Sequence, residues 1–165
     1  MVTQRSDGVI KSPHRPPGIA AADAHQAARI SYRQCDHWAR RGWVVPSIDV
    51  GRGRAGRRAY APPDVEKLDL LRHMAEAHVN TAAAGPEVAA IDIPEGDVRV
   101  MWGPLGGAEP GFIIKRAKEA LAHLEAGGAW ITWNPANVRA RIALLVGASF
   151  GDTSDTAPPT AVRSA

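Results

Sequence analysis

Residues 30–60, ISYRQCDHWARRGWVVPSIDVGRGRAGRRAY, decide how the rest of the chain is interpreted. Between Arg29 and Arg58 the chain carries eight arginines against two aspartates, a local balance of +6 in a chain of 165 residues whose whole balance is +3. Basic residues gathered in one segment indicate a polyanionic partner, because they attract phosphate groups over a long range. This stretch is therefore the first candidate for a functional surface.

The first half of the stretch predicts a short helix over residues 32–41. Ser31 is a residue type that caps helix N termini, and Gly42 stands where a left-handed glycine often ends a helix. The alanine-rich run 19–28 predicts a preceding helix joined to it by a tight turn. Two short helices in this order form a helix-turn-helix, whose second helix enters the major groove of DNA. Helical spacing places on its inward face Cys35, Trp38 and Ala39.

The second half predicts a basic hairpin with a glycine-rich tip. Residues 47–50 and 57–60 have the composition of two paired strands, and GRGRAG between them is too rich in glycine for a strand interior. A tip of this kind can approach a sugar-phosphate backbone closely, and guanidinium groups bind phosphate in a bidentate way. A helix-turn-helix followed by a basic hairpin is a winged helix.

Beyond the hairpin, a helix over residues 64–78 presents an apolar face, and residues 81–90 form a further short helix or a linker. The face comprises Val65, Leu68, Leu71 (or Leu70) and Ala75. The back half predicts a strand at 97–102, a helix at 112–126, a strand at 129–133 and a helix at 135–145. On the helix at 112–126 we expect one apolar side, formed by Ile113, Ala117, Ala120, Leu121 and Leu124. The glycine-rich segment 103–111 is expected to be a loop.

These elements predict an α+β fold, an N-terminal winged helix-turn-helix domain followed by a small α/β strand-helix-strand-helix module. We place the domains at 19–90 and 91–150, with a flexible arm at 1–18 and a flexible tail at 151–165. The charges divide in the same way, since residues 1–80 carry a balance of +5 and residues 81–165 a balance of −2. Only the front half is expected to attract a polyanion.

Several classes of function are not expected. A single cysteine, Cys35, allows no intrachain disulfide or C-x-x-C pair, and we expect it to be a small buried residue. His73 and His78 are five apart on different helix faces, so no metal site is predicted, nor any cofactor. No nucleophile, base and acid combine into a catalytic set, so we do not expect an enzyme. Neither a signal peptide nor a membrane span is apparent, and we expect a cytoplasmic protein.

The segment YRQCDHWARRGWVVPS, the glycine-rich basic segment, RRAY and a D-V-x-x-L helix start together resemble the MerR family of transcriptional regulators. The likeness is to a branch of actinobacterial appearance whose recognition helix reads Y-R-Q-L-D-Y-W-A-R, and it covers about residues 18–80. It implies a winged helix that binds operator double-stranded DNA as a homodimer, associated with the nucleoid when bound, with RNA polymerase as a further partner. The long dimerisation helix and the sensor cysteines of well-known members are absent after Asn80, so a metal or redox trigger is not expected.

The resemblance places DNA contacts on the helix and on the hairpin. The expected DNA-binding residues are Ser31, Tyr32, Arg33, Gln34, His37, Arg40, Arg41, Arg52, Arg54, Arg57, Arg58 and Tyr60. Arg33 and Gln34 either read guanine and adenine edges or touch phosphate only. Asp36 would be repelled by DNA, so we expect it to position Arg33, Arg40 or a backbone amide.

The second module carries three tryptophans, and strand alternation places Trp130 and Trp133 on opposite faces. Together with Trp102 they are candidates for a dimer or effector surface, because interfaces and ligand pockets favour partly exposed tryptophan. Two other functions stay open. The first alternative is an excisionase-like or DNA-packaging recognition protein of phage type. The second is a small-molecule-binding module or enzyme whose basic hairpin is only solvated surface.

Overall fold

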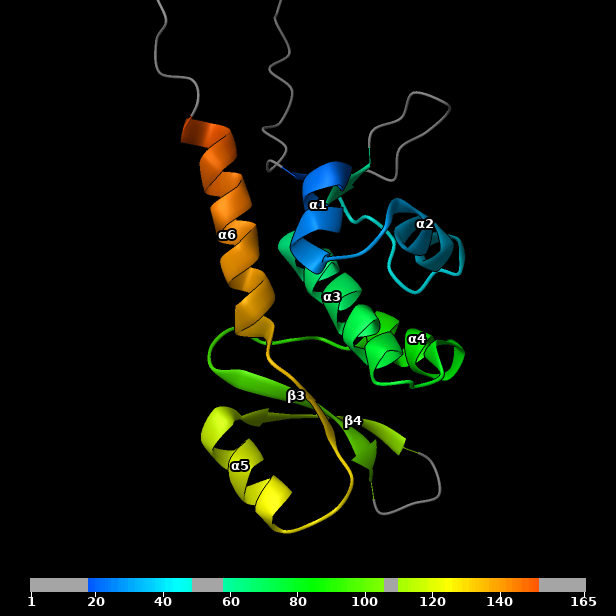
Figure 1. Ribbon diagram of the computed structural model, residues 1–165, viewed down its shortest axis with the longest axis vertical. Helices are drawn as coiled ribbons and strands as arrows, with labels where there is room; N and C mark the ends of the chain where they lie inside the picture. The colour runs from blue at the N-terminus through cyan, green and yellow to red at the C-terminus, as the bar shows by residue number, and fades with distance from the viewer. Residues whose placement is uncertain (1–17, 49–57, 106–109, 152–165) are drawn as a thin grey trace, which may run out of the picture.

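The computed structural model describes residues 18–48, 58–105 and 110–151, with side chains up to Gly147. Helices α1 to α4 gather at one end, a three-stranded sheet with α5 lies at the other, and α6 runs from the sheet to α1 (Figure 1). This is a mixed α+β arrangement. The elements are β1 Ile19–Ala20, α1 Ala21–Ala28, α2 Tyr32–Arg40, β2 Ala59–Tyr60, α3 Pro62–Glu76, α4 Thr81–Ala90, β3 Val98–Pro104, β4 Pro110–Arg116, α5 Ala117–Glu125, β5 Ile131–Trp133 and α6 Pro135–Gly151.

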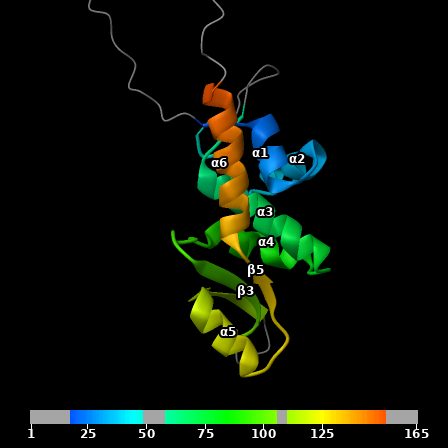
Figure 2. The ribbon, with the colours of Figure 1, turned by 60° about the vertical axis from the view of Figure 1, so that its left-hand side comes forward.

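Helix α3 lies at the centre of the packing between helices α1, α4 and α6. It contacts α1, α4, α6 and β5, and Figure 2 shows α6 alongside it. Its two N-terminal prolines suit the first turn of a helix, where no backbone donor is needed. The predicted apolar face is confirmed at three positions and extends further around the helix, because neighbours cover several sides. Its buried apolar residues are Val65, Leu68, Leu70, Leu71 and Met74.

The smaller sheet pairs β1 with β2 in antiparallel fashion, Ile19 opposite Tyr60 and Ala20 opposite Ala59. Our prediction that residues 57–60 pair with residues 47–50 was therefore wrong for β2, and the helix predicted from Ile19 begins only at Ala21. Ser47 and Ile48 form a bend, and residues 49–50 lie outside the described chain. The observed pairing buries Tyr60 fully and leaves Ile19 6% exposed, a gain in core packing that local composition does not reveal.

The larger sheet has the strand order β4-β3-β5, and both pairings are antiparallel. The helix predicted over residues 112–126 was wrong at its start, because residues 112–116 belong to β4 and α5 begins at Ala117. The β4 strand pairs with β3 along its whole length, with Phe112 opposite Trp102. On α5 only Ala120 is buried, whereas Leu121 is 60% and Leu124 37% exposed. Of the residues predicted to share one apolar side, Ile113 lies in β4, and the other four lie on α5 at helical spacing, with Ala120 alone among them buried.

Gly85 on α4 lies against the indole ring of Trp43, and a Cβ added there would come within 2.3 Å of the ring. We expect Gly85→Ala to destabilise the protein by about 1–3 kcal/mol, because overpacking outweighs the improved helix propensity. Gly147 on α6 is the matched control, since nothing lies within 4 Å of a Cβ added there. Gly147→Ala should be neutral or stabilise by up to about 1 kcal/mol. Urea unfolding of the two variants measures this difference, and equal effects would contradict the steric argument.

Candidate nucleic-acid interface

Helix α2 is fixed at both ends by the residues that its sequence indicated. Ser31 accepts from the Gln34 backbone N–H at 3.2 Å, and the Gln34 side chain accepts from the Ser31 N–H at 2.9 Å. This is a capping box, in which two otherwise unpaired helix-terminal donors are satisfied. Gly42 has φ +74° in the left-handed region, as predicted. Cys35 and Trp38 are buried, which confirms the predicted inward face, whereas Ala39 is half-buried.

The opposite side of α2 is exposed and basic. Arg33, His37 and Arg40 follow one another at i, i+4 and i+7, so they share one face of the helix, and all three are exposed. Gln34 and Arg41 flank this face, and Tyr32 is 64% exposed at the N-terminal turn. We call Arg33, His37 and Arg40 the outward face of α2. This face presents two guanidinium groups and one imidazole to solvent.

Asp36 lies beside this face and joins it to the end of the basic segment. Its two carboxylate oxygens accept from Arg40 at 2.9 Å and from Arg58 at 2.9 Å. The expectation that Asp36 positions Arg40 is confirmed, whereas the bond to Arg58 was not foreseen. The hydrogen bond from Arg58 holds the pKa of Asp36 below its usual value. Burial acts to lower the pKa of Arg58, but the hydrogen bonds and charges of Asp36 and Tyr60 together outweigh it, so the pKa is raised.

Two residues expected at the DNA surface, Tyr60 and Arg58, make side-chain contacts within the protein. The Tyr60 side chain is fully buried, and its hydroxyl lies 3.0 Å from Cys35 Sγ. Burial, followed by the hydrogen bond to Cys35, raises the pKa of Tyr60. Tyr60 is therefore a core residue rather than a DNA contact, because β2 turns its side chain inward. The Arg58 side chain is 26% exposed and bound to Asp36, so it ties the residue just before β2 to α2. Cys35 is a small buried residue, as predicted.

Asp64 ties together the two chain segments that flank the basic stretch. One carboxylate oxygen accepts from the Ser47 backbone N–H, the Ser47 hydroxyl and the Ala61 N–H, each at 2.8 Å. An acidic residue three positions after the N-cap residue, as Asp64 is after Ala61, is a recognisable capping signal, although its bond to Ser47 is not. Arg52, Arg54 and Arg57 lie outside the described residues. The tip with Arg52 and Arg54, and the place of Arg57 in the hairpin, therefore stay predictions.

The three tryptophans of the back half are not equally accessible. Trp133 is 4% exposed and donates its indole N–H to Asp69 at 2.8 Å, and Trp102 is 7% exposed and packs edge-on against Phe112. Trp133 is a core residue, because the sheet turns it inward, which corrects our expectation for that residue. Trp130 is half-buried against His123. With Trp102 it lines a hollow of about 410 Å³ at the end of the sheet.

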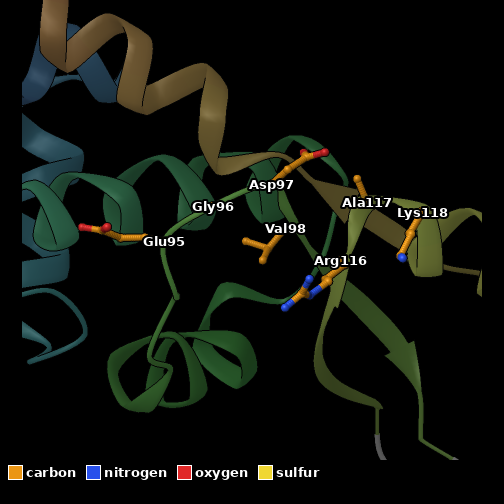
Figure 3. Close-up of a pocket in the computed structure, with 7 residues that line it drawn as sticks. All are labelled: Glu95, Gly96, Asp97, Val98, Arg116, Ala117 and Lys118. Carbon is orange, nitrogen blue, oxygen red and sulfur yellow. The ribbon is translucent and has the colours of Figure 1, made fainter.

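A second hollow, of about 440 Å³, lies where β3 begins and β4 passes into α5 (Figure 3). Glu95 and Asp97 come from one side of it, and Arg116 and Lys118 from the other, so its charges are mixed. Within the described residues no group of three or more His, Cys, Asp or Glu could hold a metal ion. No helix in the described part of the chain is long and apolar enough to cross a membrane. The lining of one hollow is of mixed charge and that of the other is largely apolar. The outward face of α2 is therefore the better candidate for binding a polyanion.

Comparison with known proteins agrees with a helix-turn-helix. No family model matches the chain. Over 63 residues it is 35% identical to uncharacterized HTH-type transcriptional regulators of Mycobacterium bovis and of two strains of Mycobacterium tuberculosis. The match covers 38% of this chain and 28% of the length of each relative. The chain thus spans only a little more than a quarter of the length of each of these regulators.

Proposed function

We propose that the chain is a sequence-specific DNA-binding transcriptional regulator of the helix-turn-helix class, of the MerR type. The outward face of α2 carries the proposal. It is basic and exposed on a helix whose opposite side is anchored by Cys35 and Trp38. A helix so anchored can enter the major groove without deforming the core, and arginine there pairs with guanine or phosphate. The names of the mycobacterial relatives support the same class.

In this proposal the side chains on and beside α2 meet base edges and nearby phosphates. They are Ser31, Tyr32, Arg33, Gln34, His37, Arg40 and Arg41. The basic residues Arg52, Arg54 and Arg57 act as a wing on the flanking backbone, and Arg58 holds the base of that wing through Asp36. Guanidinium groups suit this part because they bind phosphate in a bidentate way. Gln34 has two roles in this proposal. Its side-chain carbonyl oxygen accepts the capping-box hydrogen bond, and its side-chain amide nitrogen donates to DNA.

We further propose that the regulator acts as a homodimer, that residues 91–150 supply the dimer or effector surface, and that RNA polymerase is a partner at the promoter. Leu121 and Leu124 on α5 are 60% and 37% exposed, which is unusual for large apolar side chains next to one another on a helix. The hollow beside Trp130 is a second apolar feature of the same region. Both are features of a region that meets another molecule.

Selection of bound duplexes from a random pool tests the proposal with the full chain. We expect a consensus of two inverted half-sites whose centres lie about 10 base pairs, or a multiple of that, apart, because a two-fold dimer imposes its symmetry on the DNA. A single unrepeated half-site would contradict the homodimer. Failure to enrich any duplex at low salt would contradict DNA binding itself. Enriched DNA with no promoter effect, together with co-purifying integrase or packaging ATPase, would favour the excisionase-like or packaging alternative.

A further inference from the structure

Two acidic residues on α3 are buried and paired with arginines of α6. Glu66 is 5% exposed and accepts from Arg139 Nε at 2.8 Å and Nη2 at 2.9 Å. Asp69 is 1% exposed and accepts from Arg141 Nη2 at 2.7 Å. Buried carboxylates of this kind are stable only when they are paired and hydrogen-bonded. These two ion pairs therefore hold α6 in place along α3.

The two arginines differ in what else they bind. Arg139 donates further to the carbonyls of Pro94 and Gly96, in the segment that leads into β3. Arg141 donates its Nε to the carbonyl of Ala27 at 2.6 Å, in the last turn of α1. The last carbonyls of a helix have no partner within the helix, and a cation there also suits the negative end of the helix dipole. Arg141 thus binds the C terminus of the first helix of the helix-turn-helix.

Only three residues, 29 to 31, separate α1 from α2. Arg29 takes a left-handed conformation with φ 55°, its N–H bonded to Gln26 O, and the Ile30 N–H bonds to His25 O. Ile30 itself is buried at 9% exposure. A turn this short and this fully bonded transmits the direction of the end of α1 to the start of α2. In both views α1 lies between α6 and α2, so α6 reaches α2 through α1 (Figures 1 and 2).

We propose that Arg141 is a positioning residue for the helix-turn-helix. By holding the C-terminal end of α1, Arg141 sets the orientation of α2. It thereby affects DNA affinity without contacting α2 itself. Because Asp69 binds both Arg141 and the Trp133 indole, β5 is part of the same connection. An effector or partner that moves β5 or α6 would change DNA affinity, and DNA would change the affinity for that effector by the same factor. The inference rests on the proposed function of α2.

Arg141→Met and Arg139→Met form a matched pair for the test. Each removes one guanidinium from α6 and one ion pair with a buried carboxylate of α3, but only Arg141 reaches α1. We expect Arg141→Met to weaken binding to the selected duplex about tenfold with an unchanged salt slope, because no phosphate contact is lost. Arg139→Met should bind within about twofold of the unchanged protein. Arg141→Lys, which keeps one donor, should recover part of the loss.

Amide hydrogen exchange in the DNA-free protein gives a second readout. Each variant is measured at the same number of degrees below its own melting temperature. We expect the amides of residues 30–35 to exchange faster in Arg141→Met but not in Arg139→Met. Equal affinity of both variants and the unchanged protein would overturn the inference while leaving DNA binding in place. Equal losses in both would also overturn it, since they would follow stability alone. If the unchanged protein binds no duplex, the proposed function fails, and the exchange comparison still decides whether Arg141 orders α2.

Discussion

Asp69→Ala is expected to lower the free energy of unfolding by about 3–5 kcal/mol, because it breaks a buried charge network. The Asp69 carboxylate accepts from the Trp133 indole at 2.8 Å, from Arg141 at 2.7 Å and from Arg72 at 3.0 Å. Without it, Arg141, whose side chain is 20% exposed, loses its counter-charge, Arg72 keeps only the exposed Glu76, and a buried indole N–H loses its acceptor. The donors come from α3, β5 and α6, so the loss should loosen all three elements.

Glu76→Ala is the control for this prediction. Glu76 also accepts from Arg72, but its side chain is 62% exposed, and exposed ion pairs contribute at most about 1 kcal/mol. Urea unfolding, followed by tryptophan fluorescence and by circular dichroism, measures both variants. A loss for Asp69→Ala no larger than that for Glu76→Ala would show that the buried network does not hold α3, β5 and α6 together.

The features of the fold that the sequence predicted are those fixed by neighbouring residues. A serine before helix 32–40 and a glycine after it were interpretable because capping depends on residues only a few positions apart. The burial of Cys35 and Trp38 followed from helical spacing in the same way. The basic, exposed outward face of α2 could be predicted for the same reason, since it needs no contact from elsewhere in the chain.

The features that the sequence did not predict depend on partners far away. Residues 112–116 have the apolar character of a helix start, and only pairing with β3 makes them a strand. Two-residue strands such as β1 and β2 show no periodicity at all, so their pairing could not be foreseen. Tyr60 was expected at the DNA surface as part of the basic hairpin, but its ring lies in the core beside Cys35.

Buried charge was the least predictable feature. Glu66 and Asp69 occur in a helix whose acidic residues would ordinarily face solvent. Their partners Arg139 and Arg141 follow 73 and 72 residues later, and no local pattern connects them. The Asp36 to Arg58 bond is of the same kind, spanning 22 residues. In each case the position of a charge was visible in the sequence, whereas the group that neutralises it depended on the tertiary fold.

The double variant Arg33→Ala/Arg40→Ala is expected to weaken binding to the selected duplex by about 100-fold or more, because each arginine contact contributes roughly 1–3 kcal/mol. Both residues lie on the outward face of α2, and Arg40 is 78% exposed despite its bond to Asp36. Asp36 keeps Arg58 as a partner when Arg40 is removed, so the fold should be retained. Affinity measured at several salt concentrations separates the two kinds of contact. A phosphate contact lowers the salt slope by about one when lost, whereas a base contact changes sequence preference.

The control removes the same charge from the other end of the molecule. Arg116→Ala/Lys118→Ala takes two exposed cations from the end of β4 and the start of α5, beside the hollow shown in Figure 3. Both double variants should unfold within about 0.5 kcal/mol of the unchanged protein, since exposed substitutions rarely cost more. If net charge alone drew the protein to DNA, the two variants would lose affinity equally. A loss confined to the α2 variant requires these arginines to lie at the DNA surface, and equal losses would leave α2 without a specific part in binding.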